Sequence, residues 1–329
     1  MASHRRELVS LIEQGAIRPE EVPRAVQVAG LTPSPRAWRQ LIDRLLLWSG
    51  SLALAFAVLF FVAYNWVDMG RLPRFALVQV ALLSAAGMAV WGCAREILFR
   101  VALTSVFVLI GVLLALVGQV YQTGADPWQL FFLWALLSLP LVWVAGFDAL
   151  WVAWLVLLNL TVWLYSRTWG GLLDSMFFAG NAGLWGMALI NLAAQAVWEW
   201  GTQRRSWPGR WAICLLALGS GVPLTLLMMT WMSGEAFALA PIMAIYPVWL
   251  AVLYGVYRQW RLDLFMLAGG CVSGIAVLTS LLMRFVFWEE GVWQRQWHEG
   301  GFLLLAVSVF AMGAAAVAWL KRLNAERAP

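Results

Sequence analysis

The chain has 329 residues, of which 63% are hydrophobic and only 12% are charged. Soluble globular domains are about half apolar and about a quarter charged, so this composition excludes an ordinary soluble protein. The net charge of +5 comes from basic residues spread over many short segments between apolar runs. That distribution is typical of a membrane topology signal and not of a nucleic-acid-binding surface. We therefore expect no nucleic-acid partner.

The apolar residues form continuous runs of about 20 residues, the length that an α-helix needs to cross about 30 Å of hydrocarbon. Lipid offers no hydrogen-bond partners, so a spanning segment is either helical or part of a closed barrel. Barrel strands would show short alternating runs instead. The sequence therefore predicts an all-α, polytopic integral membrane helix bundle with about ten spans: 45–66, 75–93, 99–120, 128–146, 149–166, 175–198, 210–232, 238–257, 262–287 and 301–320.

Residues 1–44 are the only sizeable segment outside these spans. Gly15 is predicted to end one short helix and Pro19 to begin a second, which gives a short helical hairpin. A third helix, from Arg36, is predicted to continue directly into the first span. Because so short a segment rarely buries enough surface to fold alone, we expect it to dock on the transmembrane domain (45–320), on a second copy in a homo-oligomer, or on a protein partner.

Orientation follows from the positive charges in the loops. With the N terminus inside, 17 of the 22 Lys and Arg residues fall on the cytoplasmic side and 5 on the other side. Because positive loop residues are retained in the cytoplasm, this split predicts that both termini are cytoplasmic, with 321–329 as a cytoplasmic tail. The closely spaced spans 128–146 and 149–166 form either a tight helical hairpin or a re-entrant feature.

Polar residues gather where the first and third spans end, on the predicted extracytoplasmic side. Hydrogen-bonding groups at the end of an apolar helix indicate either interfacial anchoring and helix capping or a binding site for a ligand or partner. Asp126 is also placed to cap the fourth span. The candidate binding residues are Asn65, Trp66, Asp68, Gln119, Tyr121, Gln122 and Asp126.

Two spans contain segments rich in glycine near their centres. Pro removes a helical hydrogen bond, and interrupted helices expose backbone groups to substrates in transporters. Small residues equally allow close packing of neighbouring helices. The sequence leaves both interpretations open for Gly219, Gly221 and Pro223 in the seventh span and for Gly269, Gly270 and Gly274 in the ninth. The amides Asn159, Asn181, Asn191 and Gln195 are expected to bond between helices.

No catalytic residue is assigned. The chain has only two His residues, and it lacks the nucleotide-binding, zinc-protease and serine-hydrolase motifs. We therefore expect no metal ion and no cofactor. No Asp, Glu, Lys or Arg lies near the centre of a predicted span, which argues against a proton-coupled pump.

Two motifs resemble a known family. The first span ends with the sequence Phe-Val-Ala-Tyr-Asn-Trp at 61–66, and Gly-Gln-Val-Tyr-Gln occupies 118–122, followed by Gly124 and Asp126. With the helical N-terminal segment, these motifs resemble the bacterial membrane-protein family catalogued as domain of unknown function 2157, over residues of about 5–145. The resemblance implies a bacterial inner (cytoplasmic) membrane protein and implies no mechanism.

Three functions remain open from the sequence. The leading interpretation is a non-enzymatic scaffold or subunit of an envelope complex, because catalytic and ion-coupling signatures are missing and the interfacial motifs are conspicuous. The second is a carrier or flippase for a lipid-like or neutral solute, which ten helices and two glycine-rich segments favour. The third is a membrane-embedded transferase or hydrolase that uses extracytoplasmic carboxylates such as Asp68 and Asp126. Membrane lipids are expected partners in each case.

Overall fold

The computed structural model describes residues 2–28, 35–64, 70–170, 174, 178, 180–204, 210–232, 241–287 and 298–326. In this part of the chain every regular element is a helix. The elements form two compact units, 1–116 and 117–329, which are described separately.

Unit 1 begins with the predicted helical hairpin. It consists of α1 (Ala2–Glu13), the short 3₁₀ helix η1 (Pro19–Glu21) and α2 (Val22–Val28). Gly15 has a φ of +70°, a left-handed conformation that suits glycine at the end of a helix. Pro19 begins η1 as expected, because its missing N–H has no helical partner at that position.

The rest of unit 1 contains α3 (Pro35–Tyr64), α4 (Arg71–Trp91) and α5 (Glu96–Tyr121), whose last turn lies beyond residue 116. α3 is one continuous helix, which agrees with the expectation that a helix from Arg36 continues into the first span. The hydroxyl groups of Ser51 in α3 and Ser105 in α5 are hydrogen-bonded. Small buried residues on α4, such as Ala85 and Ala89, give close helix contacts.

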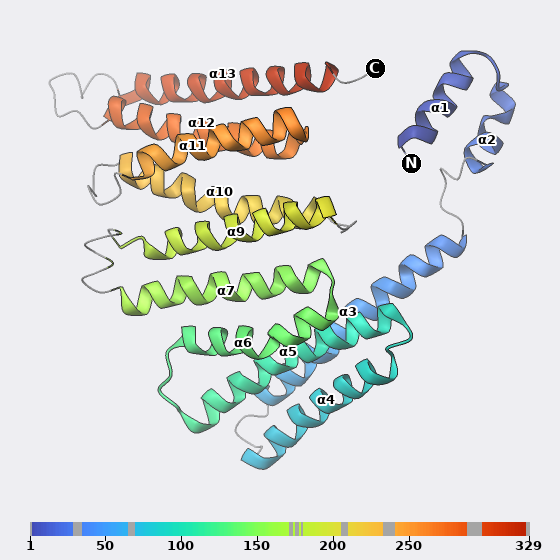
Figure 1. Ribbon diagram of the computed structural model, residues 1–329, viewed down its shortest axis with the longest axis vertical. Helices are drawn as coiled ribbons and strands as arrows, with labels where there is room; N and C mark the ends of the chain where they lie inside the picture. Colours follow the sequence, from blue (N-terminus) through green and yellow to red (C-terminus); the bar gives the residue numbers. More distant parts are fainter. Residues whose placement is uncertain are drawn as a thin grey trace. The chain divides into compact units, whose positions relative to one another are not determined.

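Unit 2 contains α6 (Pro127–Ala145), α7 (Asp148–Trp169), α9 (Ala182–Arg204), α10 (Arg210–Met232), α11 (Ile242–Gly255), the π-helix η3 (Val256–Trp260), α12 (Leu264–Phe287) and α13 (His298–Ala325). Figure 1 shows α7, α9, α10, α12 and α13 side by side in chain order, with α11 against α10 and α12. The pair α6–α7 is a helical hairpin turned at Gly146, whose φ is +60°, and the Trp154 indole N–H donates to the carbonyl of Ala135 at 2.8 Å. The structure therefore shows a helical hairpin, and whether the pair spans the membrane or re-enters it stays a prediction.

Two buried clusters fill opposite ends of the packed helices. One contains Leu155, Trp198, Leu216, Tyr257 and Leu323. The other is centred on α9, α10, α11 and α12 and contains residues such as Ala188, Leu227, Met232, Ile242 and Tyr246. Residues near the ends of α9 and α13 thus share a cluster with residues near the start of α10, so successive helices alternate in direction.

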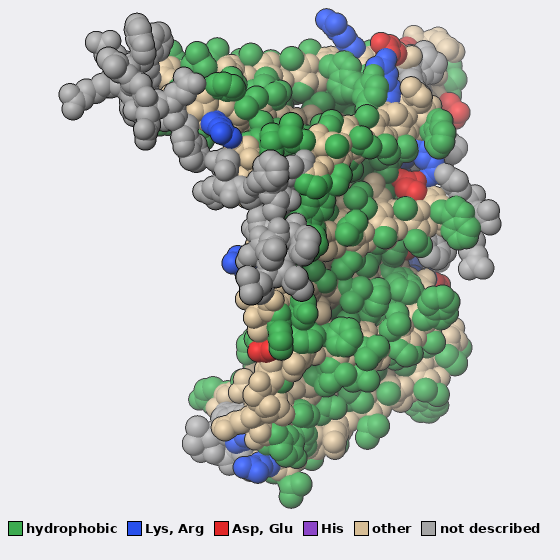
Figure 2. Space-filling view, turned by 60° about the vertical axis from the view of Figure 1, so that its left-hand side comes forward, with side chains coloured by type: hydrophobic (Ala, Val, Ile, Leu, Met, Phe, Trp, Pro, Cys, Tyr) green, Lys and Arg blue, Asp and Glu red, His purple; other side chains and the backbone are tan. Residues whose placement is uncertain are grey.

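Eight of the described helices are long and apolar enough to cross a membrane: Ala37–Phe61, Arg71–Trp91, Glu96–Tyr121, Pro127–Ala145, Asp148–Trp169, Arg210–Met232, Leu264–Val286 and Gly300–Ala325. α9 carries polar residues that lower its hydropathy, and α11 has only 14 residues. Figure 2 shows a face covered with hydrophobic side chains, with the charged side chains mostly near its margins. The all-α polytopic fold class is confirmed, and the count of ten spans stays a prediction.

Candidate functional site

The predicted extracytoplasmic cluster is described only in part. Asn65, Trp66 and Asp68 lie outside the described residues. Gln119 and Tyr121 are exposed in the last turn of α5, and Gln122 follows with a φ of +44°. These positions suit an interface, and their role as binding residues stays a prediction.

Asp126 occupies the position before the first residue of α6, as the sequence predicts. Its side chain makes no capping hydrogen bond to the helix, so the predicted side-chain cap is wrong. Instead, the Asp126 carboxylate accepts a hydrogen bond from the indole N–H of Trp169 at 3.3 Å. This contact joins the start of α6 to the end of α7, so the carboxylate orients the α6–α7 hairpin and is already engaged.

The two glycine-rich segments do not break their helices. α10 runs continuously from Arg210 to Met232 through Gly219, Gly221 and Pro223. α12 runs continuously from Leu264 to Phe287 through Gly269, Gly270 and Gly274. The interpretation as helix breaks is therefore wrong for both segments.

Three of the glycines lie where neighbouring helices pack closely. A Cβ atom at Gly219 would lie 2.7 Å from the Asn191 side-chain oxygen, and one at Gly221 would lie 3.3 Å from the Trp249 ring. A Cβ atom at Gly270 would lie 3.2 Å from Leu253. At Gly269 and Gly274, in contrast, nothing lies within 4 Å. The first group brings α9 and α11 close, whereas the second leaves open space along α12.

The open space at Gly269 is part of an apolar cleft of about 510 Å³, which we call the α10–α12 groove. Its volume lies in the range of ligand pockets in proteins. The residues that line it are Ala217, Leu218, Gly221, Val222, Thr225, Leu226 and Met229 of α10, Trp249 and Leu253 of α11, and Phe265, Met266, Ala268, Gly269, Val272, Ser273 and Ala276 of α12. The groove thus joins the two glycine-rich segments, which the sequence singled out separately.

Two hydroxyl groups at the groove wall are already hydrogen-bonded. Thr225 Oγ1 donates to the Gly221 carbonyl at 2.6 Å and lies 2.6 Å from Ser273 Oγ. A hydroxyl has one hydrogen, so Ser273 donates to Thr225 and the Tyr246 hydroxyl, 2.6 Å away, donates to Ser273. The groove therefore offers hydrocarbon contacts and few open hydrogen-bonding positions.

Polar contacts tie α10 to α12 at both ends of the groove. At one end, Arg210 at the start of α10 forms an ion pair with Asp263, just before α12. At the other end, Arg284 near the end of α12 donates to the backbone carbonyl of Met232. These two contacts fix the spacing of the helices that form the groove walls.

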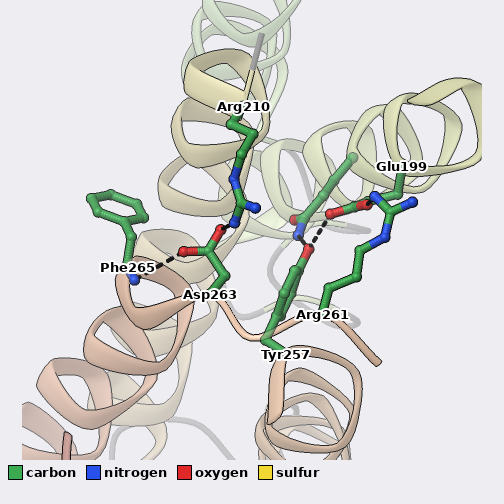
Figure 3. Close-up of polar contacts among 7 residues, drawn as sticks. Glu199, Arg210, Tyr257, Arg261, Asp263 and Phe265 are labelled. Carbon is green, nitrogen blue, oxygen red and sulfur yellow. Dashed lines mark hydrogen bonds and ion pairs between the residues drawn. The ribbon is translucent and has the colours of Figure 1, made fainter. Parts of the chain in front are cut away.

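A second polar cluster joins α9 to η3 beside the Arg210–Asp263 pair (Figure 3). Glu199 Oε1 accepts a hydrogen bond from the Tyr257 hydroxyl at 2.8 Å, and Glu199 Oε2 pairs with Arg261 at 2.9 Å. The Gln195 amide donates to the same Tyr257 hydroxyl at 3.0 Å. The carboxylate is thus paired and hydrogen-bonded, the arrangement that a partly buried charge requires.

The roles of Glu199, Tyr257 and Asp263 are not apparent from the sequence, in which Arg210 and Arg261 serve only as topology signals. The predicted interhelical hydrogen bond of Gln195 is confirmed by the structure. The detectable signal was the spacing of Asn191, Gln195 and Glu199, four residues apart, because such residues lie on one face of a helix. Their partners come from α7, α10 and η3, which no local pattern reveals.

Asn159 and Asn191 bond to each other, as expected for interhelical amides. The Asn191 amide donates to the Asn159 side-chain oxygen at 2.6 Å, and the reverse contact is 3.4 Å. Among the described residues no group of three or more His, Cys, Asp or Glu is placed to hold a metal ion. The chemistry of this region is therefore an apolar groove flanked by paired charges.

Comparison with known proteins gives one match. A family model described as "Predicted membrane protein (DUF2157)" matches residues 10–151, in agreement with the resemblance seen in the sequence. No curated protein and no solved structure matches the chain. The match ends before α9, so it covers neither the α10–α12 groove nor the polar clusters.

Proposed function

We propose that this multi-pass membrane protein, whose residues 10–151 match the family model described as predicted membrane protein (DUF2157), is a carrier for a lipid-like ligand. The ligand lies in the α10–α12 groove. Since the family description gives no activity, the proposal rests on the chemistry of the groove.

One observation carries the proposal: the groove is large, apolar and stabilised at both ends. Its volume of about 510 Å³ suits a small ligand. Thr225 and Ser273, its hydroxyl-bearing wall residues, already have partners within the protein. An unbranched hydrocarbon chain loses nothing by contacting such a surface, whereas a polar solute would leave its own groups unsatisfied.

The proposal includes a bacterial inner membrane location with both termini in the cytoplasm. The distribution of 17 against 5 positive residues supports this orientation. Within unit 2, Ala212, Tyr257 and Leu323 share one buried cluster, so the basic residues next to them, Arg210 and Arg258 among them, gather at the same end. If all of these basic residues are cytoplasmic, they must lie at the same end of the unit 2 helices.

A photo-crosslinking experiment tests the ligand. Full-length protein is reconstituted in nanodiscs with a phospholipid that carries a diazirine at the end of one acyl chain, and labelled peptides are mapped by mass spectrometry. We expect labelling on the groove faces of α10 and α12. The variant Gly269→Leu adds a side chain at a groove position where a Cβ atom has nothing within 4 Å, and it should reduce this labelling several-fold.

Gly313→Leu is the matched control. Gly313 lies in α13, outside the groove, and a Cβ there also has nothing within 4 Å. Equal labelling of α10 in wild type and Gly269→Leu would contradict a ligand in the groove. Transport is then measured in vesicles, where dithionite reduces fluorescent phospholipid in the outer leaflet: wild type should speed lipid exchange between leaflets, and Gly269→Leu should slow it toward protein-free vesicles.

A second candidate is a scaffold or subunit of a membrane complex. The N-terminal hairpin lies outside the predicted spans, and its apolar residues Val9, Leu11 and Val28 are exposed. Exposed apolar surface outside the lipid favours an interaction with another protein or with a second copy.

The scaffold function predicts a stoichiometric partner or oligomer in mild detergent, and its loss when Leu11 is replaced by Asp. Glu13→Gln, on the same exposed segment, is the control. If no partner or oligomer is recovered from wild type, the scaffold function is excluded, and the lipid experiment is unaffected.

A further inference from the structure

One end of the α10–α12 groove lies next to the charged residues of Figure 3. Phe265 lines the groove in the first turn of α12. Its backbone N–H donates to Asp263 Oδ1 at 3.0 Å, and Asp263 pairs with Arg210 (Figure 3). A lipid whose hydrocarbon chain lies in the groove would therefore have its polar headgroup beside this ion pair.

The two ion pairs expose their cations and cover their anions. The Arg210 side chain is 67% exposed, whereas the Asp263 side chain is 11% exposed. In the second pair the Arg261 side chain is 38% exposed and the Glu199 side chain is 20% exposed. The surface that faces the lipid headgroups at this end is thus cationic, although each pair is neutral as a whole.

Arg258, next to Tyr257 in η3, adds a third cation at the same end of the helices. Its guanidinium lies over the Tyr254 ring, 5.2 Å from the ring centroid, and donates to the Tyr254 hydroxyl. Guanidinium groups bind phosphate oxygens through paired hydrogen bonds. Basic residues at a membrane surface also attract anionic lipids.

We propose that the occupant of the groove is an anionic phospholipid, with one acyl chain along α10 and α12 and its phosphate at Arg210. This inference rests on the proposed function and specifies its ligand. Arg210 keeps Asp263 as a partner and contributes its exposed N–H groups to the phosphate. Charge complementarity selects the headgroup, and the apolar wall accepts the chain.

Native mass spectrometry of the detergent-purified full-length chain tests the inference. The protein is mixed with equal amounts of phosphatidylglycerol and phosphatidylcholine that have identical acyl chains. We expect phosphatidylglycerol to be retained about fivefold more, the factor that one basic residue contributes at an anionic surface. Diacylglycerol with the same chains lacks the phosphate and should bind more weakly than either phospholipid.

The double variant Arg210→Gln with Asp263→Asn removes the cation without leaving its carboxylate unpaired. It should abolish the preference, while Arg210→Lys should keep most of it. Arg322→Gln, at an exposed residue in the last turn of α13, is the control and should bind as wild type does.

The outcomes separate the two proposals. A preference that persists in the Arg210 and Asp263 double variant overturns the anionic headgroup site. If that preference persists while Gly269→Leu still lowers lipid retention, the groove remains the binding site. If the double variant does not fold, equal retention of phosphatidylglycerol and diacylglycerol by wild type overturns the headgroup site. If Gly269→Leu changes no lipid signal at all, the carrier function itself fails.

Discussion

At Gly219 the absence of a side chain decides how two polar residues pack inside unit 2. The Asn191 side chain occupies the space beside Gly219 and from there bonds to Asn159 on α7. The Asn191 amide also donates to the Met187 carbonyl at 2.8 Å, so its orientation is fixed. One missing methyl group on α10 thus permits a hydrogen bond between α7 and α9.

Gly219→Ala should destabilise the protein by about 1–3 kcal/mol, because the new Cβ must displace the Asn191 oxygen 2.7 Å away. Asn191→Ala should cost about 0.6–2 kcal/mol, the range of interhelical hydrogen bonds in membranes. In the Asn191→Ala background, Gly219→Ala should be nearly neutral. Unfolding by SDS in mixed micelles measures all three, with Gly313→Ala as control. Additive effects would exclude the steric explanation.

At the scale of elements, polar contacts hold the connection between η3 and α12 against α9 and α10. Arg261 reaches Glu199 on α9, and Asp263 reaches Arg210 on α10. η3 is a π-helix, a form that is rare and often lies near functional sites. This wide helical turn precedes Arg261 and Asp263, the two residues that make these ion pairs.

A double-mutant cycle between Glu199→Gln and Arg261→Gln measures how strongly this contact holds α9. We expect a coupling energy of about 1 kcal/mol, since both groups are partly exposed and solvent weakens the pair. The pair Glu96–Arg100 within α5 serves for comparison and should give about 0.3–0.5 kcal/mol, as surface pairs one turn apart do. A coupling near zero for Glu199 and Arg261 would leave the contact without a structural role.

At the scale of the whole molecule, the distribution of basic residues and the alternation of helix direction both favour an orientation with the Arg210 end in the cytoplasm. The loop between α10 and α11 and the loop between α12 and α13 should then lie outside the cytoplasm. Both loops follow helices that run away from the Arg210 end.

Reporter fusions at residue 329 and within 233–240 measure this orientation. Green fluorescent protein should fluoresce at the C terminus, and alkaline phosphatase should be active only in the 233–240 loop. Replacing Arg204, Arg205 and Arg210 by neutral residues should weaken the bias of that region without inverting the whole chain, because the N-terminal segment keeps its seven Arg residues. Alkaline phosphatase activity at the C terminus would require an odd number of spans.

The sequence alone determined the fold class, the chain positions of most helices and the family resemblance that a family model matches over residues 10–151. It could do so because lipid demands long apolar helices, a constraint that acts locally and leaves a visible run in the chain. The turn at Gly15 and the continuous helix after Arg36 follow from equally local chemistry. The extracytoplasmic residues Asn65 and Asp68 stay at the level of prediction.

Only the tertiary structure decided what the glycine-rich segments do and which charges meet. Gly269 borders open space, whereas the Asn191 side chain fills the space beside Gly219, although both are glycines in apolar helices. Glu199 and Arg261 are 62 residues apart in the chain, and Arg210 and Asp263 are 53 apart. Such pairs depend on the rotation and spacing of helices, which side chains from several elements set together, and the sequence of one helix carries no record of its neighbours.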